Sequence, residues 1–426
     1  GSMQVNIPGP GSTVRASLPL TLATGCMISG TGGTTGSGGT TGSGGTTGSG
    51  GTTGSGGTTG TGGTTGTGGT TGSGGATGQG GSAGATGTGG SSTGGSGGTV
   101  TPPSLTSCKE YDHNDPTDPT CNDTTGVSDY ALWSVAFSPD GKYFVSAGDD
   151  GRVKVWTFDG KTITGTTHIF TAGGASYVTF SPDSSVLFVG DRSGSLIGYS
   201  TSTWTIKTNY TGITGGIYGL ALSADGKTLV VIDDTPKIYY VPVSGTGMYS
   251  TALPAVAYSV AISPATTTGS LTVAVGFDTG RAAIYTVTAS AFTAQSAFTV
   301  ESDGSALDSV AFSPSGGLLA IGDEDGKLQS WASPFSSPTP QGTALTFSVQ
   351  QVAVAVNGLS WSKDGVYLAV SAGSNGGYLS IWNYASRTLV GMHYATYYPV
   401  SVAFSPSNTA LAGGEVACGK VVICAD

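Results

Sequence analysis

Hydrophobic and polar positions repeat along residues 130–426 in a pattern typical of short β-strands. Each repeat starts with an apolar run that ends in Ser, followed by a turn, a second apolar run, an acidic or Gly-containing turn and a third run. In the first repeat the second and third runs are Tyr143–Ala147 and Val153–Phe158, which are rich in β-branched and aromatic residues. Thr/Ser-rich segments such as Thr162–Thr171 and Ala289–Thr299 then predict a fourth, outer strand. The pattern predicts an all-β domain, because no segment has helical period.

The repeat occurs seven times, and each copy carries a serine at the end of its first apolar run. These marker serines are Ser138, Ser181, Ser223, Ser263, Ser313, Ser362 and Ser405. They lie about 40–50 residues apart, close to the spacing of propeller blades. The turn that follows, Ser-Pro-Asp-Gly at 138–141, combines a fixed φ, a side chain that bonds its own backbone and a residue that accepts positive φ. Seven units of four strands predict a seven-bladed β-propeller.

These repeats resemble those of WD40 and bacterial YVTN-type propellers. The resemblance covers residues 130–426 and rests on recurring segments such as WSVAFSPDGK at Trp133, DSVAFSPSGG at Asp308 and VSVAFSPSN at Val400. The chain lacks the Gly-His and Trp-Asp dipeptides of WD40 repeats. We therefore expect that the His-to-Trp hydrogen-bond network of that family is absent.

The last repeat ends with its third strand at 420–426, so the seventh blade lacks an outer strand. The unassigned segment 101–129 is expected to supply it, through a strand near Thr106–Tyr111. Two cysteines fall in segment 101–129 and two in the last repeat, and antiparallel pairing favours the disulfides Cys108–Cys424 and Cys121–Cys418. A local Cys108–Cys121 bridge is the alternative. Either arrangement suits an extracytoplasmic compartment.

The chain before the repeats has two parts of different composition. Residues 1–29 contain a short apolar run after Arg15 and then Cys26, which resembles a lipoprotein signal whose lipidated residue would be Cys26. An ordinary N-terminal tail is the alternative. Residues 30–100 are almost entirely Gly, Thr and Ser, with Gly at every third position of 30–90. This tract is expected to act as a flexible tether, or as an ordered stalk of extended helices packed through Gly. The propeller then occupies residues 101–426.

Charge excludes one class of partner. The chain has 15 Lys/Arg against 25 Asp/Glu, and Arg15 is the only charged residue before position 101. An acidic domain without a basic stripe repels phosphate backbones, so nucleic acid is not expected as a partner. No stretch is long and apolar enough for a transmembrane helix, so membrane attachment is expected only through a lipid on Cys26.

Residues near the central axis offer little chemistry for catalysis. One residue near the start of the first strand of each repeat is expected to line the central channel. These residues are Ser134, Tyr177, Gly219, Ser259, Ser309, Gly358 and Ser401. None of these titrates near neutral pH, so the channel wall supplies no general acid or base. The three histidines, His113, His168 and His393, lie in the closing segment or in outer-strand regions, which argues against a metal centre.

One face of the propeller is the candidate binding surface. The residues expected there are Trp133, Tyr218, Tyr258, Asp308 and Asn357 at strand entrances, with Tyr397 and Tyr398 just before the seventh blade. The turns on the same side carry Asp149, Asp150, Asp191, Asp233, Asp234, Asp278, Asp323, Glu324, Asp325 and Glu415. Aromatic rings beside carboxylates suit a sugar, a cation or a basic protein surface. Alternatively, the turn carboxylates only stabilise their own turns.

An acidic loop after the closing strand is a candidate Ca²⁺ site. Its oxygen ligands would be Asp112, Asn114, Asp115 and Asp118, with Asn122 and Asp123 nearby. The loop lacks the Gly of an EF-hand, and a plain solvated loop is the alternative. No other cofactor is expected.

Three functions follow from this reading. The first is a surface-displayed or secreted binding module that takes a protein or glycan partner. The second is an extracytoplasmic propeller enzyme similar to lactonases or quinoprotein dehydrogenases, which a deep axial pocket with three or more convergent ionisable groups would favour. The third is a fibre subunit that self-associates through residues 30–90.

Overall fold

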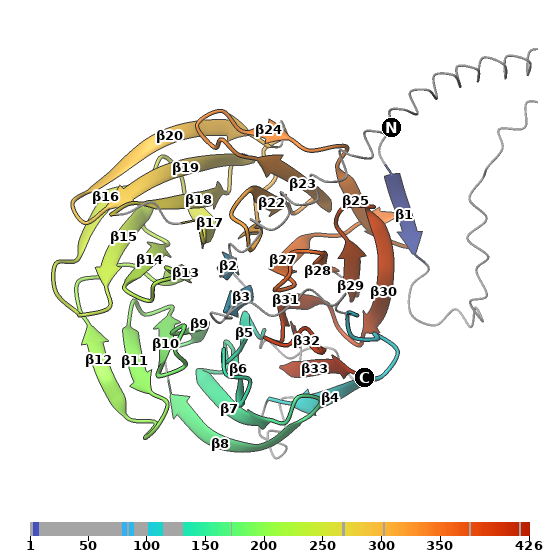
Figure 1. Ribbon diagram of the computed structural model, residues 1–426, viewed down its shortest axis with the longest axis horizontal. Coiled ribbons are helices and arrows are strands. Elements are labelled where there is room, and N and C mark those ends of the chain that lie inside the picture. Colours follow the sequence, from blue (N-terminus) through green and yellow to red (C-terminus); the bar gives the residue numbers. More distant parts are fainter. Residues whose placement is uncertain are drawn as a thin grey trace, which may run out of the picture. The chain divides into compact units, whose positions relative to one another are not determined.

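The computed structural model describes residues 3–7, 79–82, 85–88, 101–113, 131–171, 173–265, 269–300, 303–374, 376–416 and 419–426. Every regular element in these residues is a β-strand. From residue 101 onward the strands form seven antiparallel sheets (Figure 1). The seven-bladed propeller predicted from the repeats is therefore confirmed.

Each blade has four main strands, numbered outward from the axis in the order in which they pair. Blade 1 contains β5 (Ser134–Phe137), β6 (Tyr143–Ala147), β7 (Arg152–Phe158) and β8 (Ile163–Thr171). Blade 2 contains β9 (Ala175–Phe180), β10 (Val186–Asp191), β11 (Leu196–Ser200) and β12 (Ile206–Tyr210). Blade 3 contains β13 (Ile217–Leu222), β14 (Thr228–Asp233), β15 (Lys237–Pro242) and β16 (Tyr249–Ala252). Blade 4 contains β17 (Ala257–Ile262), β18 (Leu271–Phe277), β19 (Arg281–Thr288) and β20 (Ala291–Thr299).

The remaining blades follow the same order, with two short additional strands in blade 5. Blade 5 contains β21 (Ser309–Phe312), β22 (Leu318–Gly322), β23 (Lys327–Ala332) and β25 (Leu345–Val349), with β24 (Thr339–Pro340) and β26 (Val352–Ala353) beside them. Blade 6 contains β27 (Val356–Trp361), β28 (Tyr367–Gly373), β29 (Gly377–Asn383) and β30 (Thr388–Ala395). Blade 7 contains β31 (Pro399–Phe404), β32 (Ala410–Glu415), β33 (Lys420–Ala425) and, as its outer strand, β4 (Cys108–Asp112).

The first strand of every blade is the innermost one, and each contacts the first strands of the two neighbouring blades. The circle runs β5, β9, β13, β17, β21, β27 and β31 and returns to β5 (Figure 1). Because successive strands are antiparallel, the first strands begin at the same end of the sheets as the turns between second and third strands. Residues at these two places can therefore meet around the axis.

The marker serines explain why the repeats fold alike. All seven are buried, and the Ser138 hydroxyl accepts a hydrogen bond from the Tyr143 backbone nitrogen at 2.9 Å. It also donates to the Asp140 carboxylate at 2.7 Å. Six of the seven markers accept the same bond from the residue five positions on, at 2.8–3.1 Å. A buried hydroxyl thus closes the turn between the first two strands of these blades, which accounts for its recurrence.

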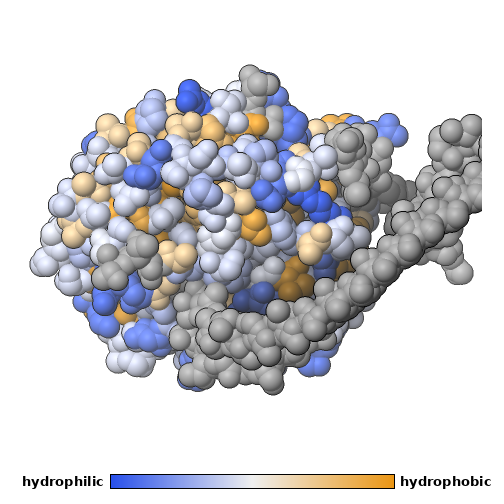
Figure 2. All heavy atoms as spheres, turned by 45° about the horizontal axis from the view of Figure 1, so that its top comes forward, coloured by the Kyte–Doolittle hydropathy of each residue, from blue (hydrophilic) through white to orange (hydrophobic). Residues whose placement is uncertain are grey.

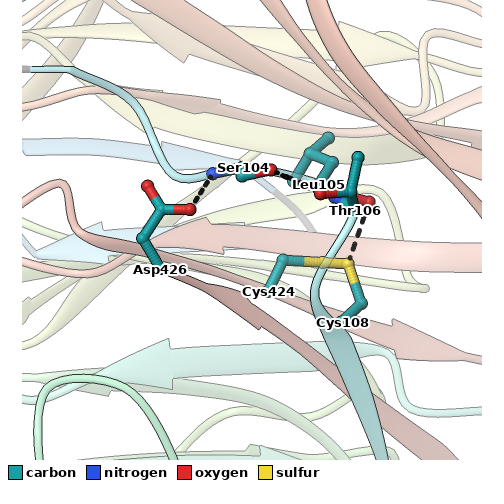
Figure 3. The surroundings of a disulfide bond; sticks show 6 residues. All are labelled: Ser104, Leu105, Thr106, Cys108, Cys424 and Asp426. Atoms are coloured by element: carbon teal, nitrogen blue, oxygen red, sulfur yellow. Dashed lines mark hydrogen bonds between the residues drawn. A yellow bond between two sulfur atoms is a disulfide. The ribbon is translucent and has the colours of Figure 1, made fainter.

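The ring is closed by an N-terminal strand, as predicted. Strand β4 pairs antiparallel with β33; it begins two residues later and ends one residue later than the predicted segment Thr106–Tyr111. Cys108 faces Cys424 in this register, and a disulfide joins them (Figure 3). The backbone nitrogen of Ser104 also donates to the Asp426 carboxylate at 3.1 Å. The proposed Cys121–Cys418 bridge lies outside the described residues.

The core lies between neighbouring blades. At the junction where the ring closes, Leu132 and Phe137 of the blade 1 segment pack with Ala403, Val421 and Ile423 of blade 7. Each is at most 2% exposed, so the closing junction is as well buried as the others. Burying such side chains is the main source of free energy that holds neighbouring blades together.

Serines on the first strands are buried between blades, and the prediction that they line a channel is wrong. Ser259 donates to the Leu307 carbonyl, Ser309 to Val356 and Ser401 to Leu132, each at 2.8 Å and each across a blade junction. Ser134 likewise accepts from the Val178 backbone nitrogen at 3.2 Å. Small hydroxyl residues are therefore suited to these positions because they bond to the next blade.

A His-to-Trp network is present in blade 1, contrary to expectation. Trp156 Nε1 donates to Ser146 Oγ at 3.0 Å, and that oxygen lies 2.7 Å from His113 Nδ1. His113 Nε2 lies 3.4 Å from an oxygen of Asp150. His113 is fully buried, and burial lowers its pKa. The histidine comes from the closing segment, so the network ties that segment to blade 1.

Figure 2 shows hydrophilic and hydrophobic residues interspersed on the side in view. The large exposed apolar side chains are Ile206 in blade 2, Tyr258 in blade 4, Val352 in blade 5, and Val366, Leu389 and Val390 in blade 6. A search of the described residues finds no helix of the length and hydropathy needed to cross a membrane.

The N-terminal hundred residues contribute three short strands, β1 (Met3–Ile7), β2 (Gln79–Ser82) and β3 (Ala85–Thr88). Strands β2 and β3 pair as an antiparallel hairpin. Cys26 and most of the Gly-rich tract lie outside the described residues, so lipidation and the choice between tether and stalk stay predictions.

Candidate functional site

A pocket of about 430 Å³ opens on the face where the first strands begin. This volume falls in the range of ligand-binding sites. All seven blades or their leading segments contribute to its lining. The lining residues are Trp133, Tyr177, Arg192, Tyr218, Tyr258, Asp308, Glu324, Ala355, Asn357, Gly373, Ser374, Tyr398 and Val400.

The structure brings together six of the seven residues predicted for the binding face. They are Trp133, Tyr218, Tyr258, Asp308, Asn357 and Tyr398. Tyr397 is not among the lining residues, and its backbone nitrogen donates to the buried Glu415 carboxylate at 3.1 Å. Of the other lining residues, Tyr177 was expected in the channel wall and Glu324 among the turn carboxylates of this face, whereas Arg192 was not assigned to the pocket. Arg192 stands in a second-to-third strand turn, so the repeat alignment contained the signal needed to find it.

Arg192 forms one side of the pocket. Its guanidinium carbon lies 5.1 Å from the ring centres of both Trp133 and Tyr218, within the range of cation–π attraction. Arg192 Nε is 3.7 Å from the Asp149 carboxylate, which in turn accepts a hydrogen bond of 2.6 Å from Trp133 Nε1. The charge of Arg192 is therefore already matched by two rings and one carboxylate.

Asp308 and Glu324 form the opposite, acidic side. Burial raises the pKa of Asp308 to about 7, and the negative charges of Glu324 and Asp323 add to this effect. Tyr258, which stands next to them in the lining, has its pKa raised mainly by burial and further by several groups that include Asp308 and Glu324. Its ring centre is 6.0 Å from that of Tyr218. A tyrosine pair thus connects the acidic side to the side that Arg192 occupies.

Asn357 has a structural part in the pocket wall. Its amide nitrogen donates to the carbonyl oxygens of Gly373 and Pro399, both at 2.9 Å. Because Pro399 belongs to blade 7, this side chain bridges blades 6 and 7. We expect Asn357 to hold the pocket's shape, with no spare donor for a ligand.

Several of the turn carboxylates are committed to their own turns. Asp191 accepts bonds from the backbone nitrogens of Ser193 and Ser195, both at 2.9 Å. Asp233 accepts from the Thr235 nitrogen at 3.0 Å, and Asp323 from the Lys327 nitrogen at 2.8 Å. For these residues the alternative of turn stabilisation is the one that the contacts support. The acids left to face the pocket are Asp308 and Glu324.

Replacing Asp308 by Asn should stabilise the fold at pH 8 by on the order of 2 kcal/mol and should change little at pH 4. The folded pKa of about 7 exceeds the unfolded value, so the unfolded chain gives up this proton more easily. The free energy of unfolding therefore falls as pH rises between the two pKa values, and a neutral Asn removes that loss. Urea denaturation at pH 4, 6 and 8 measures the effect.

Asp225→Asn is the matched control. Asp225 is an exposed turn carboxylate that accepts from Ser223 at 2.6 Å, in a turn at the other end of its blade. Asn preserves an acceptor there and removes the same charge. Equal stabilisation at pH 4 and pH 8 in Asp308→Asn would contradict the raised pKa.

The described residues contain no cluster of three or more His, Cys, Asp or Glu side chains placed to hold a metal ion. Of the candidate Ca²⁺ ligands, Asp112 forms an ion pair with Lys420 at 2.8 Å. Asn114, Asp115 and Asp118 lie outside the described residues.

Comparison with known proteins supports the fold and the repeat type. The family model described as "WD domain, G-beta repeat" matches residues 120–157, 295–332 and 345–383. The last two matches each begin in the outer strand of one blade and end in the third strand of the next. Three segments of the chain therefore match WD40 repeats, and they lie within a seven-bladed β-propeller.

Among solved structures, the chain is similar to the β-propeller domain of Cps50 (Swd1) from Myceliophteria thermophila. The TM-score is 0.57 at 16% sequence identity, and the similarity covers 70% of this chain and 97% of that domain. At this identity the likeness concerns the fold alone. No curated protein sequence matches the chain.

Proposed function

We propose that this protein is a non-catalytic binding module that takes a segment of a protein partner into its axial pocket. The observation that carries the proposal is the convergence of Trp133, Tyr218, Tyr258 and Tyr398 around one pocket of about 430 Å³. Aromatic side chains at the centre of a concave surface are typical of residues that dominate binding energy. WD40 propellers generally serve as protein-interaction modules, which agrees with this use of the pocket.

The proposal also includes the place of the module in the cell. A lipid on Cys26 would fix the chain to a membrane surface, and residues 30–100 would hold the propeller away from it. The Cys108–Cys424 disulfide supports an oxidising, extracytoplasmic compartment. The acidic and aromatic pocket face would then be presented to partners outside the cytoplasm.

Selection of binding peptides on the full chain tests the proposal. A random peptide library displayed on phage should yield binders whose affinity falls about tenfold or more in Tyr258→Ala, because that side chain is the exposed aromatic of the pocket. Ile206→Ala is the matched control, since Ile206 is 59% exposed on the outer strand β12. Titration calorimetry with the selected peptides measures both variants. Binders that ignore Tyr258→Ala, or the absence of any binders, would overturn the proposal.

The second candidate is an enzyme, and the pKa of Asp308 is the observation that favours it. A carboxyl with a pKa of about 7 beside a second carboxyl suits general acid–base catalysis. Three charged side chains, Arg192, Asp308 and Glu324, line the pocket together with four tyrosines, which reaches the number of ionisable groups that would favour an enzyme. The guanidinium of Arg192, however, is held by two rings and Asp149. Only the two acids then converge on a ligand, and for this reason binding is the function we prefer.

A further inference from the structure

Both sides of the pocket combine aromatic rings with carboxylates, but only one side contains a basic side chain of the protein itself. On the first side the guanidinium of Arg192 lies over Trp133 and Tyr218 and close to the Asp149 carboxylate. On the second side Tyr258 stands with two carboxylates, Asp308 and Glu324. Among the pocket-lining residues Arg192 is the only basic one. Arg192 thus occupies the aromatic and acidic site on the first side. The lining of the second side supplies no basic side chain of its own.

The carboxylates of the second side have no partner within the described part of the chain. Neither Asp308 nor Glu324 takes part in an ion pair there, and neither carboxylate accepts a hydrogen bond. Lys327, of the same blade, lies 4.0 Å from Asp303. A largely buried carboxylate without a partner is costly, because burial disfavours its charged form. A cation supplied by a partner would pair with these carboxylates and offset the cost of burying their charge.

We propose that the partner segment is anchored by one basic side chain, a lysine ammonium or an arginine guanidinium, that inserts beside Tyr258 and within reach of the carboxylates of Asp308 and Glu324. This inference rests on the proposed function, because it names the chemistry of the segment that the pocket takes. A cation seated on a desolvated ring gains cation–π attraction and charge pairing together. A formal net charge of −10 also favours the approach of a basic partner.

A neutral partner such as a sugar fits the second side less well. Stacking on Tyr258 would be satisfied, but the carboxylates would stay buried without a counter-charge. The net charge of the pocket favours the cation, since Arg192 is already matched by Asp149 and the two remaining acids are not.

Charge-neutral analogues of the selected peptides test the inference. In peptides that bind the full chain and depend on Tyr258, each Lys is replaced by norleucine and each Arg by citrulline, which keep the shape and remove the charge. At pH 8 one such replacement should weaken binding about tenfold or more, as measured by titration calorimetry. Asp308→Asn with Glu324→Gln should weaken the parent peptide by a similar factor and should make parent and analogue bind equally. Asp225→Asn, the charge-matched control, should leave both affinities unchanged.

The pH dependence supplies a second readout for peptides without histidine. Asp308 is faced by Glu324 and Asp323 of its own blade, by Tyr258, Tyr218 and Tyr177 of other blades, and by Arg192 across the pocket. Because the pKa of Asp308 is about 7, its negative charge is lost as pH falls from 8 to 6. Affinity for the parent peptide should fall over this interval and should stay level in Asp308→Asn.

The outcomes separate the two proposals. If the selected peptides depend on Tyr258 but bind equally after their basic residues are neutralised, the proposed binding of a basic side chain is wrong. The proposed peptide-binding pocket is then still supported. If no peptide depends on Tyr258, the proposed peptide-binding pocket is wrong, and the proposed binding of a basic side chain in it is wrong as well. If the neutral analogues bind weakly to wild type yet the Asp308→Asn and Glu324→Gln changes have no effect, the basic residue is bound elsewhere and the inference is overturned.

Discussion

A chain that begins at residue 114 is expected not to fold cooperatively, whereas a chain that begins at residue 101 should still fold cooperatively, although it lacks the pairing of β1 with β25 and of β3 with β5. The shorter chain lacks β4, so β33 becomes an open edge and blade 7 keeps three strands. It also loses the Cys108–Cys424 disulfide and four buried residues, Pro102, Pro103, Leu105 and His113. Together these losses amount to more than about 5 kcal/mol, which is comparable with the whole stability of many domains.

Circular dichroism during heating and urea denaturation compare the two chains with the full protein. The chain from residue 101 controls for the loss of the preceding segment alone, and it tests whether the propeller domain is bounded at that residue. A chain from residue 114 that melts within a few degrees of the longer one would show that the circle does not depend on the strand at its N-terminal end.

The repeats were sufficient to predict the blades, because each unit carries its own turn chemistry and strand pattern. The marker serine and the turn after it form local bonds, such as Ser138 to Tyr143 at 2.9 Å, so the signal lies within five residues. The closing strand could be placed within two residues because the last repeat visibly lacked its fourth strand. The Cys108–Cys424 pairing followed from the same register.

The contacts between blades could not be predicted in the same way. The first-strand serines were expected in a channel, yet Ser259, Ser309 and Ser401 bond to the next blade. Alternation along a strand tells which residues share a side but not which neighbour that side meets. The network through His113 was missed for a related reason: its members are brought together only when the ring closes.

The positions that form the candidate site could be predicted from the sequence. The contacts of their side chains and the pKa of Asp308 depend on the three-dimensional structure. Six predicted residues do line one pocket, since the repeat alignment places strand entrances together. That Arg192 lies over Trp133 and Tyr218, which stabilise its charge, depends on side-chain directions. The raised pKa of Asp308 arises mainly from burial, which no sequence position specifies.

Removal of the disulfide should have the second large effect on stability. Replacing Cys108 and Cys424 together by Ser is expected to lower the free energy of unfolding by about 3–5 kcal/mol, because the bridge restricts an unfolded loop that spans most of the domain. The two cysteines are 316 residues apart in the chain, and the bridge joins its outer closing strand to its last strand. Ring closure then depends on backbone pairing of β4 with β33 and on the buried contacts of Leu105 and His113.

Urea denaturation under oxidising conditions, followed by fluorescence, measures the change in the Cys108→Ser, Cys424→Ser double variant. Dithiothreitol supplies the control in a background that also carries Cys121→Ser and Cys418→Ser: there it should lower the stability of the chain that retains Cys108 and Cys424 by a similar amount, and it should leave the chain without these two cysteines unaffected. A wild-type chain that keeps its stability after full reduction would mean that strand pairing alone closes the circle. In that case the loss of stability expected for the chain from residue 114 would have to come from β4 and its buried neighbours. The two experiments together separate the contribution of the disulfide to the free energy of unfolding from that of the strand.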